Sequence, residues 1–122
     1  MPAYLHDGVL LYLDRLADWD SYFTLTKGDA VDVEGERDAL RGVLETAAQI
    51  CEQIEPDCRE TWEQPAELVD GEVVLPESSQ KAYALLKEAG LVSLSVREEY
   101  GGFELPGFAS NIVIQMLSPI HI

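Results

Sequence analysis

The chain has 122 residues, a formal net charge of −15 and 47% hydrophobic residues. Its length suits one domain and excludes a two-domain enzyme, and its hydrophobic content argues against wholesale disorder. The charge argues against nucleic acid or an anionic membrane surface as a default partner, because both would repel the chain. We expect a soluble cytoplasmic protein with a solvated acidic surface, and the charge leaves a high-salt host open as an alternative.

The sequence carries no pattern that predicts export or membrane insertion. No cationic region precedes an apolar run after Met1, so we expect no signal peptide, and no apolar run approaches 18 residues, so we expect no membrane span.

The two cysteines, Cys51 and Cys58, lie in a stretch that predicts helix, which places them about 10 Å apart. This is too far for a disulfide, and the spacing is not that of a zinc site, so both are interpreted as small core residues in a reducing compartment.

The N-terminal 30 residues predict a short helix followed by an aromatic segment. Residues 4–16 carry apolar side chains at helical spacing, namely Leu5, Val9, Tyr12, Leu13 and Leu16. Three aromatic residues then follow within five positions, Trp19, Tyr22 and Phe23. They could form a binding platform, but a loop or short helix that inserts its rings into the core is the favoured interpretation.

Residues 27–35 have a linker composition, and a long helix is expected over 36–55. Its apolar stripe steps by four and three alternately through Leu40, Leu44, Ala47, Cys51, Ile54 and Cys58. Pro56 should kink or end the helix, and because the stripe reaches Cys58, a kink with continuation to 62 is favoured. A coiled-coil seam is the weaker alternative, since fewer than three full heptads are present.

A β-hairpin and two further helices are expected in the second half. Asp70-Gly71 between short β-prone arms predicts a hairpin turn, and Ser78 or Ser79 is expected to cap a helix over 78–89 that ends at Gly90. A partly alternating stretch over 91–96 and a tight Gly101-Gly102 turn precede a last helix over 106–117, with Pro106 in its first turn. The fold class is therefore mainly α with one small hairpin. The expected core contains Leu44, Ile54, Leu85, Leu86, Ile112 and Met116.

Little in the sequence predicts chemistry by the chain alone. His6 and His121 have no cysteine or acid at ligand spacing and are expected on the surface. No phosphate-binding glycine pattern is present, and the adjacent Glu98 and Glu99 are expected in a solvated loop rather than as a catalytic pair. We assign no catalytic, cofactor-binding or metal-binding residue, and the substrate-binding residues stay unknown.

One ordered series of motifs resembles the N-terminal helical domain of acyl-CoA dehydrogenases. A helix ending in Glu88-Ala89-Gly90-Leu91 is followed by the loop Glu98-Glu99-Tyr100-Gly101-Gly102 and by Leu105-Pro106 before another helix. Glu55-Pro56 in a long helix, the stretch from Asp70 to Pro76, and an opening similar to the N-terminal extension of some bacterial members add to the likeness, which covers most of 4–118. Departures are Arg97, Phe103-Glu104 and Pro119, which should break a helix that continues in the family.

The resemblance implies an acyl-CoA dehydrogenase N-terminal-like helical bundle, with an N-terminal extension over 1–30, the helical domain over 31–118 and an atypical tail over 119–122. In the family this part forms one wall of the acyl pocket of an FAD-dependent oxidoreductase of fatty-acid β-oxidation. A β-domain and a C-terminal bundle that supplies the glutamate base complete the enzyme. Acyl-CoA and electron-transfer flavoprotein are the partners that the family implies.

The sequence given contains neither of those two parts. We therefore expect the 122-residue chain alone to be inactive, to hold no FAD and to self-associate through exposed apolar surface. The alternative is a non-enzymatic helical interaction module.

Overall fold

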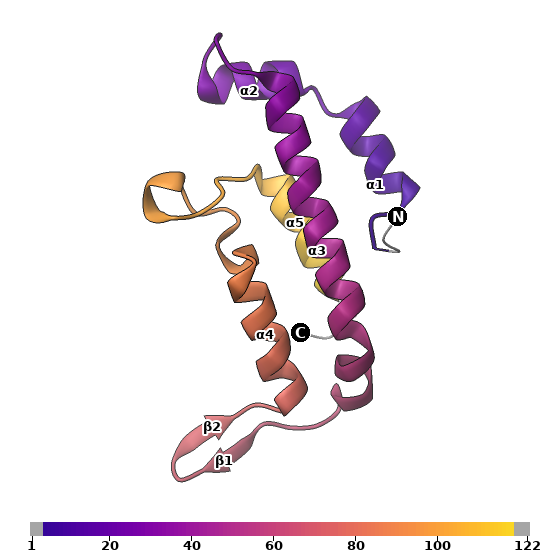
Figure 1. Ribbon diagram of the computed structural model, residues 1–122, viewed down its shortest axis with the longest axis vertical. Coiled ribbons are helices and arrows are strands. Elements are labelled where there is room, and N and C mark those ends of the chain that lie inside the picture. Colours follow the sequence, from indigo (N-terminus) through magenta and orange to yellow (C-terminus); the bar gives the residue numbers. More distant parts are fainter. Residues whose placement is uncertain (1–3, 119–122) are drawn as a thin grey trace.

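The computed structural model describes residues 4–118, and within them the chain is mainly helical with one two-stranded hairpin, as predicted. The long helix α3 (Val33–Thr61) is the spine, and α2 (Trp19–Lys27), α4 (Glu77–Glu88) and α5 (Gly107–Leu117) pack against it (Figure 1). The hairpin of β1 (Glu67–Val69) and β2 (Glu72–Val74) extends beyond the end of α4, at the opposite end of the molecule from α2.

Helix α3 begins earlier than predicted because Asp32 caps it. The Asp32 carboxylate accepts a hydrogen bond from the backbone N–H of Gly35 at 3.1 Å, and the helix starts at Val33 rather than at residue 36. The last three residues of the expected linker are therefore helical. At the other end the helix continues through Pro56 to Thr61, which confirms continuation rather than a stop.

The N-terminal helical segment covers residues 7–16 rather than 4–16, and it changes along its length from an α-helix to a π-helical turn. Helix α1 (Asp7–Leu11) begins at residue 7, because the His6 ring accepts a hydrogen bond from Gly8 N–H at 3.1 Å and caps it there. A π-helical turn, η1 (Tyr12–Leu16), follows without a break and ends where Ala17 N–H donates to the Tyr12 carbonyl.

The aromatic segment is a helix that inserts its rings into the core, as the favoured interpretation predicted. Helix α2 is capped by Asp18, and Trp19 and Phe23 are 5% and 3% exposed. Their rings stack at a centroid separation of 5.5 Å, and the ring of Phe108 from α5 lies 5.2 Å from that of Trp19. The N-terminal segment and α5 therefore share one hydrophobic core.

The hairpin turns at Asp70-Gly71 as predicted, with both residues at positive φ, 51° and 85°. Such a turn matches the right-handed twist of the strands that it joins. The expected serine caps of α4 are wrong: Pro76 occupies the N-cap position, no side chain caps the helix, and the Ser78 hydroxyl pairs with the hydroxyl of Thr61. Gly90 follows α4 with a φ of 75°, in the left-handed conformation that its position predicted.

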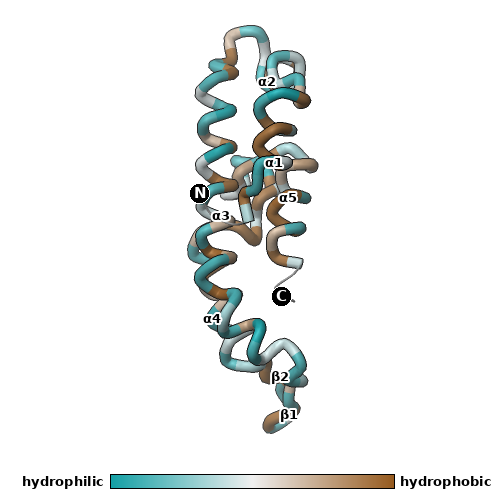
Figure 2. Tube along the Cα trace, turned by 90° about the vertical axis from the view of Figure 1, so that its right-hand side faces the viewer, coloured by the Kyte–Doolittle hydropathy of each residue, from teal (hydrophilic) through white to brown (hydrophobic). Residues whose placement is uncertain are grey.

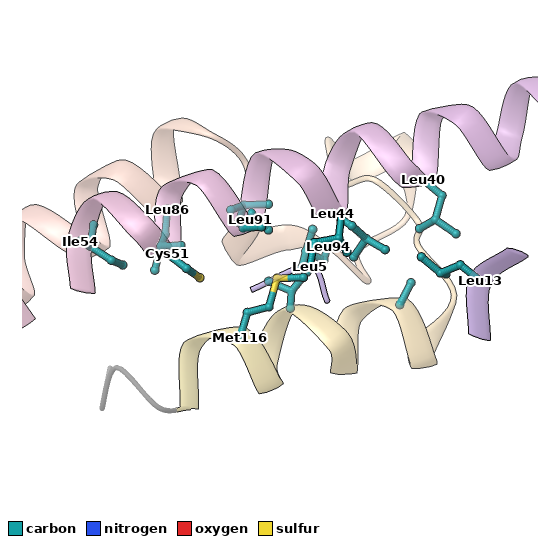
Figure 3. Packing of buried hydrophobic residues seen from close by; sticks show 14 of the residues in the cluster. Leu5, Leu13, Leu40, Leu44, Cys51, Ile54, Leu86, Leu91, Leu94 and Met116 are labelled. Atoms are coloured by element: carbon teal, nitrogen blue, oxygen red, sulfur yellow. The ribbon is translucent and has the colours of Figure 1, made fainter. Parts of the chain in front are cut away.

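The core lies between α3, α4 and α5, and Leu5 and Leu13 of the N-terminal segment also belong to it (Figure 3). Four of the six expected core residues are buried, Leu44, Ile54, Leu86 and Met116, and so are both cysteines. Leu85 and Ile112 are partly buried and pack against this core from its edge. Helix α5 turns Ala109, Val113 and Met116 inward. Apolar residues occur on several sides of α5, mixed with polar ones (Figure 2), so the sequence did not distinguish the buried face.

Candidate functional site

A groove of about 540 Å³ lies where α2, α3 and the segment 98–106 meet. Its floor is apolar and comes from all three segments: Phe23 and Leu40 are buried, and Val43 and Leu105 are half-buried. The volume is in the range of small-molecule sites. The groove is therefore preformed by residues that are far apart in the sequence.

Charged side chains line the same groove. Lys27 Nζ lies 2.9 Å from Glu36 Oε1 and 3.9 Å from Glu98 Oε1, and Glu104 also belongs to the lining. The hydrogen bond to Glu36 raises the pKa of Lys27 above its usual value, although desolvation acts in the opposite direction. With three carboxylates and one ammonium, the lining carries an excess of negative charge.

The wall formed by residues 96–106 is held by backbone constraints. Gly101 has a φ of 84°, which confirms that one glycine of the pair adopts the left-handed conformation. A Cβ on Gly102 would lie 2.0 Å from the Val96 carbonyl oxygen, so the second glycine is required by close approach. Glu104 also has a positive φ, 49°, and its N–H donates to the same Val96 carbonyl at 2.9 Å. The wall is therefore a tight loop in which Glu104 has a defined position.

The adjacent Glu98 and Glu99 do not act as a pair. Both are exposed, Glu98 approaches Lys27, and Glu99 lies 2.7 Å from Arg97. This agrees with a solvated loop. Sequence reasoning missed Lys27, Glu36 and Glu104 as groove residues, because nothing in their local pattern reveals that three separate segments meet.

The hairpin presents an uncovered apolar surface. Every residue of both strands is exposed, and the register pairs Leu68 with Val73. The side chains of Leu68 and Val73 are 74% and 71% exposed on one face, and Leu75, which directly follows β2, is 50% exposed. We call these three residues the hairpin face. An antiparallel sheet normally packs one face on a core, which this face does not do.

A second cavity of about 370 Å³ lies between α1 and α5. Its lining is neutral or weakly basic, with Tyr12, Phe108 and Ile112 as the apolar part and His6, Asn111 and Gln115 among the polar side chains. His6 is exposed, as predicted, while His121 lies outside the described residues. Within residues 4–118 no carboxylate lines this cavity, in contrast to the groove.

Both thiols are free and buried. Burial raises the pKa of Cys51 to about 11 and raises that of Cys58 as well, so both favour the neutral form.

Over residues 4–118 no group of three or more metal-ligating side chains comes together. No helix in that range is long and apolar enough to cross a membrane.

Comparison of the chain with protein-family models, with curated proteins and with solved structures gives no match. The likeness to acyl-CoA dehydrogenases therefore depends on the motif series in the sequence.

Proposed function

We propose that the chain is the N-terminal helical part of an FAD-dependent acyl-CoA dehydrogenase and contributes one wall of its acyl pocket. The observation that supports this most is the ordered motif series between Glu88 and Pro106. In the structure it corresponds to a helix end at Gly90, a tight glycine loop and a helix start, with α4 and α5 both packed on α3.

Uncovered apolar surface is consistent with a part that needs neighbours. Tyr83 on α4 and Ile114 on α5 are 54% and 60% exposed, and the hairpin face is exposed throughout. Removal of an α-proton beside a flavin needs a site closed to water, and one helical layer cannot enclose it. In this proposal the other walls, the flavin site and the base come from other parts of the enzyme.

A non-enzymatic interaction module is the second candidate. The hairpin face favours it, because a two-stranded hairpin exposed on both sides gains stability when a partner covers it. The two candidates predict different products of the complete gene. If the chain is part of the enzyme, the gene also encodes a β-domain and a second helical bundle. If the chain is an interaction module, the gene encodes neither.

The experiment compares two proteins, the 122-residue chain and the product of the genomic reading frame extended beyond residue 122. Each is purified and examined for flavin absorbance and for reduction of an artificial electron acceptor by a set of acyl-CoA thioesters. We expect flavin and turnover in the extended protein and neither in the chain alone.

Three outcomes decide between the candidates. Flavin and turnover in the chain alone would refute the claim that it is an incomplete part. An extended frame with neither a β-domain nor acyl-CoA oxidation would reject the dehydrogenase proposal and leave the interaction module. The part of the extended frame that follows residue 122 can also be purified as a separate protein. Acyl-CoA oxidation that appears when this protein is mixed with the 122-residue chain would support the proposal.

A further inference from the structure

We propose that the groove between α2, α3 and the segment 98–106 binds a small organic cation with an apolar tail, such as a primary alkylamine in its ammonium form. This proposal does not depend on the proposed dehydrogenase function. The proposal combines three properties of the groove, which are its volume, its floor and its charge.

The floor fits an alkyl chain. Phe23, Leu40, Val43 and Leu105 contribute apolar side chains from three segments, within a volume of about 540 Å³. An alkyl tail placed there leaves water and contacts mainly the half-buried Val43 and Leu105. Phe23 and Leu40, each 3% exposed, are already fixed by the core beneath them. Little side-chain ordering is then needed on binding.

The charge selects the head group. Glu36, Glu98 and Glu104 surround one ammonium, that of Lys27, so the lining has a net charge of −2 from these four groups. Lys27 lies 2.9 Å from Glu36 and 3.9 Å from Glu98, and the Glu104 carboxylate accepts only a long hydrogen bond, 3.4 Å, from the backbone N–H of Glu98. The whole chain, at −15, adds to the same field. A cationic head is therefore attracted, and an anionic one such as a carboxylate is repelled.

Neither of the other two surfaces combines these properties. The cavity between α1 and α5 has an apolar lining but no carboxylate among the described residues, so it offers no selection for a cation. The hairpin face is apolar and lines neither that cavity nor the groove.

The experiment titrates the chain with hexylammonium, hexanol and hexanoate, which share one tail and differ in head-group charge. Binding is followed by NMR of the Leu40 and Val43 methyl groups, with the Leu68 and Val73 methyl groups of the hairpin as a control for non-specific adsorption. We expect saturable shifts at Leu40 and Val43, with affinity in the order hexylammonium, hexanol, hexanoate, and with the preference for the cation reduced by salt.

Substitutions in the groove test the charge argument in both directions. Glu98→Gln and Glu104→Gln should each weaken hexylammonium binding by about two- to five-fold, the size of an exposed ion pair. Lys27→Gln should tighten it, because the local cation is lost. Glu72→Gln in the hairpin changes the net charge equally and should leave the affinity unchanged.

The results that would overturn the proposal are specific. Equal affinity for hexanoate and hexylammonium would show that the carboxylates do not select the ligand. Equal effects of Glu72→Gln and Glu104→Gln would show that only the total charge matters. Shifts of the hairpin methyl groups that parallel those of Leu40 would indicate surface adsorption instead of a site.

Discussion

The helical layer and the hairpin use apolar residues in opposite ways. Around α3 the side chains of Leu44 and Cys51 are 0% exposed, whereas Leu68 and Val73 in the hairpin are 74% and 71% exposed. Burial removes apolar surface from water and stabilises the fold, while exposed apolar surface contributes nothing until something covers it. We therefore expect the helices to provide most of the free energy of unfolding, and the hairpin to provide the surface through which the chain associates.

The largest contrast is expected from truncating leucine and valine side chains. Leu44→Ala and Leu86→Ala should each lower the free energy of unfolding by about 2–5 kcal/mol, because they leave cavities in a packed core. Val73→Ala in the hairpin should change it by less than about 0.5 kcal/mol. Urea unfolding followed by circular dichroism measures all three, and comparable losses at Leu44 and Val73 would break the comparison.

The neighbouring Leu85 sharpens the same test, because it is half-buried where Leu86 is buried. Leu85→Ala should cost less than Leu86→Ala in the same measurement. A reversed order would mean that α4 packs through a different face.

Two glycine substitutions should change stability in opposite directions. Gly102→Ala should destabilise by more than about 1 kcal/mol, since its Cβ would overlap the Val96 carbonyl at 2.0 Å and the loop would have to shift. Gly42→Ala, inside α3 with nothing within 4 Å of the new Cβ, should stabilise by about 0.5–1 kcal/mol. Thermal unfolding of both variants checks this, and a neutral Gly102→Ala would show that the loop is loosely held.

A smaller effect is expected at alkaline pH. Burial and a hydrogen bond to Glu55 raise the pKa of Tyr4 from 10.0 to about 12, so the folded state holds this proton more tightly than the unfolded state. The stabilisation is fully present below pH 10 and is lost as the pH rises from 10 towards 12. Tyr4→Phe should reduce the pH dependence of unfolding in this window, and Tyr83→Phe on the exposed side of α4 is the control. An unchanged slope in Tyr4→Phe would remove Tyr4 as its source.

Substitutions in the hairpin face should have the smallest effect on the free energy of unfolding and a clear effect on self-association. Replacing Leu68 by Ser and Val73 by Thr should leave the free energy of unfolding within about 0.5 kcal/mol of the wild type. The same double variant should reduce self-association, because it removes most of the hairpin face. Sedimentation equilibrium gives the mass in solution. A wild-type chain that stays monomeric at high concentration would contradict the association part.

The sequence predicted what local pattern determines. The α3 stripe, the Asp70-Gly71 turn, the position of Gly90 and a positive φ at one glycine of the Gly101-Gly102 pair all follow from periodicity or from the φ that a turn requires, and each is present in the structure. The start of α3 was missed although a signal was available, since aspartate is a preferred N-cap residue and Asp32 directly precedes the helix.

Features that depend on tertiary contacts were not predictable in the same way. The buried face of α5 is set by packing on α3, because apolar residues occur on several of its sides. Ser78 forms a hydrogen bond with Thr61 rather than a cap, which depends on how α3 and α4 meet. The groove required Lys27, Glu36 and Glu104 to converge from three segments.

Native-state amide hydrogen exchange of the 122-residue chain tests the contrast between the two regions most directly. We predict that amides of α3 between Leu44 and Cys51 exchange only through global unfolding, and that amides of β1 and β2 exchange through local opening at a much lower free energy. Equal protection of the hairpin and of α3 would contradict the account, because it would show that the hairpin is part of the same cooperative core.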